Sequence, residues 1–150
     1  MKKNVFSIII IEILFLISCN QKVPYGKLDF PITFQKKIKS QITKGKFVVY
    51  YHSGECSFCF GTLLAISNDF PGLPIVSISS SHNVVMIDYY LEQIGFKGIS
   101  LNDSTSLFLK RNQKVLSTQN LFLIDSQYNI LAGGIELDKR MNKKINQVIR

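Results

Sequence analysis

The chain has 150 residues, a formal charge of +8 at pH 7, 46% hydrophobic residues and no tryptophan. This length fits one domain, the composition excludes whole-chain disorder, and three cysteines are too few for a small disulfide-scaffolded domain. The lysines gather at 36–46, 110–114 and 139–144 without interleaved aromatic residues, so we expect solvent-exposed basic faces and no nucleic-acid partner. Attraction to anionic lipid headgroups is the alternative use of this charge.

The N-terminal segment has the features of a secretory signal. Lys2 and Lys3 precede an apolar stretch from Val5 to Ile17, which is too short for a convincing membrane-spanning helix. The stretch ends in Leu16-Ile17-Ser18-Cys19, which resembles the lipobox of bacterial lipoproteins. That resemblance implies cleavage after residue 18 and acylation of Cys19. We therefore expect a signal peptide over residues 1–18 and a lipid-anchored, extracytoplasmic protein of the bacterial cell envelope.

An uncleaved N-terminal anchor is the alternative, and Cys19 would then be an incidental thiol. Residues 19–28 are polar and contain a proline and a glycine, so we expect a tether, followed by one domain over residues 29–150. Early in this domain, apolar side chains recur every four residues, which predicts an amphipathic helix that ends near Gly45. The apolar positions of this helix are Phe34, Ile38 and Ile42.

The next elements follow from continuous apolar runs. The β-branched and aromatic run Phe47–Tyr51 predicts a buried strand, and His52–Glu55 predicts a turn. A helix is then expected from Cys56 to about Asp69. After a break rich in proline and glycine, the run Ile75–Ser79 predicts a second strand.

Capping residues mark the elements of the second half. Ser81 is expected to cap a helix, Gly98–Leu101 is a short extended piece, and Asp103 or Ser104 caps a short helix through Leu109. The apolar face of the first of these helices consists of Val84, Ile87, Leu91 and Ile94.

The C-terminal part predicts a hairpin and a helix. Leu121–Ile124 and Ile130–Ala132 read as strands joined by the turn Asp125–Asn129. A final helix follows two glycines and has an apolar face of Leu137, Met141, Ile145 and Val148. Strands that alternate with helices and then form a hairpin predict an α/β fold, with a central mixed sheet of about four to five strands flanked by helices.

The motif Cys56-Ser57-Phe58-Cys59 carries the predicted chemistry. A cysteine in the first turn of a helix faces unpaired backbone N–H groups and the positive end of the helix dipole, and both favour a thiolate. Cys59 follows almost one turn later, within reach of a mixed disulfide on Cys56. Cys56 is therefore the predicted nucleophile and Cys59 the predicted resolving cysteine.

Four stretches in this order resemble the thioredoxin-like superfamily, especially its extracytoplasmic TlpA-like and peroxiredoxin-like (redoxin) branch. They are Phe47–Tyr51, Cys56–Cys59, Ile99–Asp103 and Leu121–Asp125. The resemblance spans residues 33–149 and implies a thioredoxin-like fold. It also implies a redox-active Cys56–Cys59 disulfide and thiol–disulfide exchange with proteins of the envelope. No organic cofactor or metal is expected.

The sequence departs from this family pattern at two positions. The residue before the motif is usually aromatic, whereas here it is Glu55, whose carboxylate should raise the pKa of the Cys56 thiol. The family has a cis-proline just before the strand at residue 121, and Gln119 stands near that place, so we expect a trans bond there. We expect Glu55, Ser57, Phe58 and Gln119 to tune the site.

Two alternatives use the same residues differently. The chain could be a catalytically degenerate thioredoxin-like domain that only binds partners. It could also bind copper or zinc through Cys56, Cys59 and a histidine, His52 or His82, although the sequence shows no evident fourth ligand.

Overall fold

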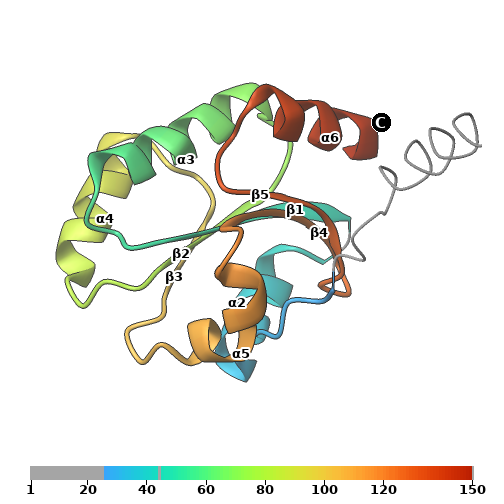
Figure 1. Ribbon diagram of the computed structural model, residues 1–150. Coiled ribbons are helices and arrows are strands. Elements are labelled where there is room, and N and C mark those ends of the chain that lie inside the picture. The colour runs from blue at the N-terminus through green and yellow to red at the C-terminus, as the bar shows by residue number, and fades with distance from the viewer. Residues whose placement is uncertain (1–25, 44, 150) are drawn as a thin grey trace, which may run out of the picture.

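The computed structural model describes residues 26–43 and 45–149, which form five helices around one sheet (Figure 1). The predicted signal peptide, Cys19 and the tether as far as residue 25 lie outside this range. The strands are β1 Lys46–His52, β2 Ile75–Ser79, β3 Ile99–Asn102, β4 Leu121–Asp125 and β5 Ile130–Gly134. The helices are α2 Ile32–Gln41, α3 Ser57–Asp69, α4 Val84–Gln93, α5 Leu107–Leu116 and α6 Lys139–Ile149.

The sheet is mixed, with strand order β3-β2-β1-β4-β5. β2 pairs in parallel with both β1 and β3, whereas β4 pairs antiparallel with β1 and with β5. β1 is the central strand and is buried over most of its length, as is β2, because helices cover both faces of the sheet. This explains why both strands are continuous apolar runs rather than alternating ones.

Two apolar clusters lie on opposite faces of the sheet. The first packs α2 and α5 against one face and contains Phe47, Val49, Phe108 and Phe122. The second packs α3, α4 and α6 against the other face and contains Tyr50, Cys59, Phe60 and Ile145. Figure 1 shows the same arrangement, with α3 and α6 on one side of the sheet and α2 and α5 on the other. The α/β fold with a mixed sheet predicted from the sequence is therefore confirmed.

Three predicted boundaries are wrong at the N-terminal side. Lys27 and Leu28 belong to the folded domain and not to the predicted tether, because Lys27 forms a β-bridge with Asn129 and Leu28 is fully buried. α2 ends at Gln41 rather than near Gly45. His52 is the last residue of β1 and not part of the turn, since it pairs with Ser79 of β2.

One predicted cap and one predicted helix end also need correction. α4 begins after Asn83, whose side chain accepts a hydrogen bond from the Met86 N–H, so Ser81 is not its N-cap. α5 begins at Leu107 and runs to Leu116, well beyond the predicted end at Leu109. Within the described residues, no helix is long and apolar enough to cross a bilayer.

Candidate active site

The link between β1 and α3 presents the motif at the end of the central strand. Gly54 has a φ of +78°, and a Cβ at this position would lie 2.9 Å from Ile87 Cδ1. Only glycine fits this turn without strain. The turn leads to Cys56, which is the N-cap residue of α3. The chain thus places the first cysteine of the motif at the positive end of the helix dipole.

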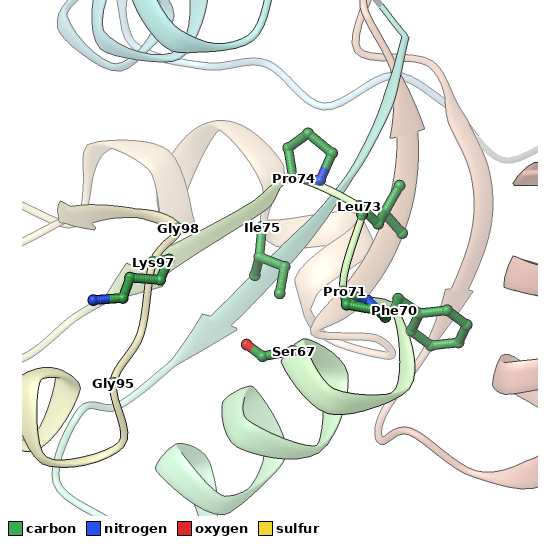
Figure 2. A pocket seen from close by; sticks show the side chains of 10 residues that line it. Ser67, Phe70, Pro71, Leu73, Pro74, Ile75, Gly95, Lys97 and Gly98 are labelled. Carbon is green, nitrogen blue, oxygen red and sulfur yellow. The ribbon is translucent and has the colours of Figure 1, made fainter.

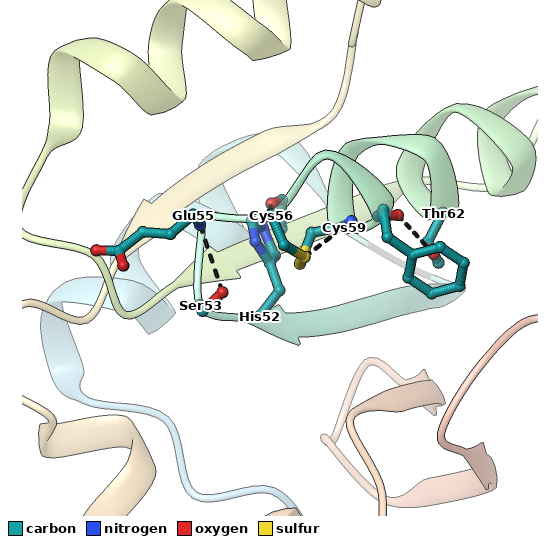
Figure 3. Close-up of a disulfide and its surroundings, with 8 residues drawn as sticks. His52, Ser53, Glu55, Cys56, Cys59 and Thr62 are labelled. Carbon is teal, nitrogen blue, oxygen red and sulfur yellow. Dashed lines mark hydrogen bonds between the residues drawn. A yellow bond between two sulfur atoms is a disulfide. The ribbon is translucent and has the colours of Figure 1, made fainter.

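Cys56 and Cys59 form a disulfide with their Cα atoms 5.4 Å apart (Figure 3). The Cys56 Sγ accepts a hydrogen bond from the Cys59 backbone N–H at 3.1 Å. Cys59 is 6% exposed, whereas Cys56 is only partly buried. The two cysteines therefore differ in environment, since Cys56 is partly exposed and accepts a helix N–H whereas Cys59 lies in the apolar cluster.

The other residues of the motif and the residue before it differ in exposure and orientation. Phe58 is 67% exposed, and Ser57 is exposed as well. The exposed Glu55 directs its carboxylate to Ser81, whose Oγ donates to Oε1 at 3.2 Å. In Figure 3 the Glu55 side chain extends away from the disulfide. Its carboxylate is therefore not held against the Cys56 sulfur in the oxidised protein.

His52 is the buried polar residue of this site, with 4% exposure. Its ring stacks on Tyr50 with centroids 5.1 Å apart and meets Phe60 edge-on at 5.8 Å. Nε2 lies 2.8 Å from Ser77 Oγ, and Nδ1 is buried with no hydrogen-bond partner. Burial lowers the pKa of His52 to about 4, so the imidazole is neutral at neutral pH.

Gln119 lies at the same end of the sheet, just before β4. The Tyr51 N–H donates to the Asn120 carbonyl at 2.8 Å, which places this segment beside the end of β1. Gln119 packs against Gly133, where a Cβ would collide with Gln119 Oε1. Every peptide bond in the described residues is trans, including the one before Gln119.

No protein-family model matches this chain, and no curated protein matches its sequence. Solved structures do match. The thioredoxin domain of a thiol-disulfide oxidoreductase from Bacteroides vulgatus superposes with a TM-score of 0.58 at 16% identity, over 79% of this chain and 84% of that one. The fold is thioredoxin-like.

Two further structures share this thioredoxin-like fold. A thiol-disulfide oxidoreductase from Bacteroides fragilis has a TM-score of 0.55 at 14% identity and covers 68% of this chain and 80% of its own. A secreted disulfide oxidoreductase from Mycobacterium tuberculosis has a TM-score of 0.50 at 13% identity and covers 72% and 84%. At these identities the likeness defines the fold, which is the one that the sequence motifs predict.

The thioredoxin-like domain does not assemble the alternative metal site. Among the described residues, no group of three or more His, Cys, Asp and Glu side chains is placed to hold a metal ion. His52 is buried and engaged with Ser77, and His82 is exposed before α4. In the described part of the chain, therefore, no third ligand joins the two cysteines in the arrangement that the copper or zinc alternative requires.

A surface pocket of about 360 Å³ lies at the opposite end of α3 from the disulfide (Figure 2). Its walls come from the last turn of α3, the link to β2 and the loop before β3, and they include Ser67, Phe70, Leu73 and Lys97. Because α3 begins beside Cys56 and ends beside this pocket, the pocket is not part of the candidate site.

The sequence did not predict the buried environment of His52. The residue stands four positions before Cys56 and was expected in a turn or as a metal ligand. Its contact with Ser77 joins residues 25 apart in the chain, which no local pattern reveals. One available signal was that a polar residue ends an otherwise apolar strand.

Proposed function

We propose that this protein is a thiol–disulfide oxidoreductase, anchored to a membrane by acylated Cys19, that exchanges disulfides with protein thiols of the bacterial cell envelope. The observation that carries the proposal is the Cys56–Cys59 disulfide at the start of α3, with the more exposed sulfur at the N-cap. The thioredoxin-like fold supports it, as do the names of the three similar structures described above, each of which is an oxidoreductase.

The two sulfurs have different tasks in the exchange. In the reduced protein, the Cys56 thiolate attacks one sulfur of a substrate disulfide, and the other substrate sulfur leaves as a thiolate. Cys59 then loses its proton and attacks Cys56 Sγ, which releases the second substrate thiolate and forms the Cys56–Cys59 disulfide. The substrate disulfide gains two electrons and two protons, and the protein dithiol loses them. The reverse sequence oxidises a substrate dithiol.

A Cys59→Ser variant tests the proposal by trapping. It should form mixed disulfides through Cys56 with envelope proteins, and these adducts should disappear on treatment with dithiothreitol. In the reduced wild-type protein, Cys56 should react with an alkylating reagent much faster than Cys59 does, because Cys56 is partly exposed whereas Cys59 is buried.

The matched control is Cys56→Ser, which keeps the buried cysteine and should trap nothing. Equal trapping by both variants would contradict the assigned roles. Partners that bind equally well when both cysteines are serine would instead identify a degenerate thioredoxin-like binding module.

A further inference from the structure

The unpartnered nitrogen of His52 is the starting point. Nδ1 is buried and makes no hydrogen bond, whereas Nε2 of the same ring is hydrogen-bonded to Ser77 Oγ. A buried polar group without a partner costs free energy. Such a group calls for an explanation, and a redox role is one that fits a side chain beside the disulfide.

The Ser77 hydroxyl decides which nitrogen carries the proton. Ser77 is 1% exposed, and its contact with His52 is the only hydrogen bond of its hydroxyl within the described residues. If Ser77 donates to Nε2, the hydroxyl proton is satisfied and the ring proton lies on Nδ1. The opposite assignment leaves both the hydroxyl proton and the Nδ1 lone pair without partners. The network therefore favours His52 as an unpaired Nδ1–H donor.

This donor lies on the face of the sheet that carries the disulfide. His52 contacts Tyr50 and Phe60, and both belong to the apolar cluster that contains Cys59. Phe60 directly follows Cys59 on α3. Figure 3 shows the imidazole directed from the end of β1 toward the first turn of α3, where the disulfide lies.

No other buried ionisable side chain in the described residues is available to donate a hydrogen bond to the sulfurs. Apart from tyrosines and cysteines, only His52 and Asp103 are both buried and ionisable. Asp103 is engaged elsewhere, since its two oxygens accept the Phe108 and Leu109 N–H groups at the start of α5. His52 is therefore the available donor.

We propose that the Nδ1–H of His52 donates a hydrogen bond to the Cys56 thiolate in the reduced protein and so favours the dithiol over the disulfide. This inference rests on the proposed exchange function. It names a residue that shifts the equilibrium between the dithiol and disulfide forms of the protein. A disulfide sulfur is a weak acceptor, whereas a thiolate is a strong one, so the hydrogen bond forms only on reduction. His52 stays neutral because burial holds its pKa low, which keeps a single N–H for this purpose.

The test is the equilibrium of the protein with glutathione. Two glutathione molecules become one glutathione disulfide, and two electrons pass to the Cys56–Cys59 pair. His52→Phe keeps an aromatic ring but removes the donor, so the equilibrium constant should shift toward the protein disulfide. A hydrogen bond to an ionised group corresponds to a shift of roughly tenfold to a hundredfold. A tenfold shift is about 30 mV for this two-electron couple.

Two further variants separate hydrogen bonding from packing. His52→Asn keeps a donor near the position of Nδ1 and should stay closer to the wild type than His52→Phe. Tyr51→Phe removes a neighbouring buried hydroxyl on the other face of the sheet and should leave the equilibrium unchanged. An unchanged equilibrium in His52→Phe would overturn the proposal.

Nitrogen NMR of the wild-type protein tests the same idea without any variant. The imidazole should carry its proton on Nδ1, and the Nδ1 signal should move on reduction. A proton on Nε2 in the reduced protein would overturn the inference. A disulfide that never equilibrates with glutathione would refute the proposed function instead, so the two failures are distinguishable.

Discussion

At the scale of single residues, the buried imidazole of His52 makes the stability of the fold depend on pH. Its pKa is about 4 in the folded protein and near 6.5 in an unfolded chain, so the unfolded chain binds more protons between these values. As the pH drops from 6.5 to 4, the protein should lose about 3 kcal/mol of the free energy of unfolding because of this group alone. Urea unfolding across this range should show the slope.

The control for that slope is a comparison of histidines. His52→Phe should flatten the pH dependence of the free energy of unfolding in this window, although carboxylates still contribute at its acidic end. His82 is exposed, so His82→Gln should retain the wild-type slope. A full slope in the His52→Phe variant would show that the buried histidine is not its source.

The orientation of Glu55 limits its influence on Cys56. The carboxylate is exposed and bound by Ser81, so water and salt screen it. Glu55→Gln should lower the pKa of the Cys56 thiol, but by less than about 0.7 unit, which is the effect of charges about 4 Å apart in water. The measurement is the pH dependence of the alkylation rate, with Glu92→Gln on α4 as control. A drop larger than one unit would mean that the carboxylate turns toward the sulfur on reduction.

At the scale of elements, Asp103 determines where α5 begins. Asp103 is 2% exposed, and its carboxylate accepts the N–H groups of Phe108 and Leu109, each at 2.9 Å. Asp103→Ala should therefore lower the free energy of unfolding by about 2 kcal/mol. Ser104→Ala should change it by less than about 0.5 kcal/mol, because Ser104 is exposed. Equal losses in guanidinium unfolding would contradict this assignment.

The strands were predictable from sequence because burial on both faces requires continuous apolar runs. β2 has the predicted bounds, and β1 extends the prediction by one residue at each end. The extent of α5 was not predictable, since its core-facing position 112 is an asparagine. The Asn112 amide is buried and bonds to the backbone of Asp29 and Phe108. This polar core contact interrupts the apolar pattern on which the prediction depended.

The candidate site also has features that the sequence predicts and features that it does not. The asymmetry of Cys56 and Cys59 follows from a local rule, the start of a helix after a buried strand. The environment of His52 and the direction of Glu55 depend instead on Ser77 and Ser81, which another strand and the loop after it supply. Contacts of this kind arise from tertiary packing and leave no periodic signal in the sequence.

At the scale of the whole molecule, the fold and the proposed anchor together define where the site can act. The folded domain already includes Lys27 and Leu28. If Cys19 carries the lipid, residues 19–25 connect it to the domain and can span at most about 25 Å. The domain is then confined to a shallow layer above one membrane. Substrates must be proteins that reach this layer, which agrees with envelope thiols as partners.

The anchor itself is tested by lipid labelling of whole cells. Because the apolar segment ends in Leu16-Ile17-Ser18-Cys19, labelled palmitate should enter the wild-type protein, which should fractionate with membranes. Cys19→Ala should lose the label and either leave the membrane fraction or remain unprocessed. A variant with serine at both Cys56 and Cys59 keeps Cys19 and should be labelled normally, which excludes acylation at the redox pair. Labelling that persists in Cys19→Ala would contradict the anchor, and the redox chemistry at Cys56 would then have to be placed without it.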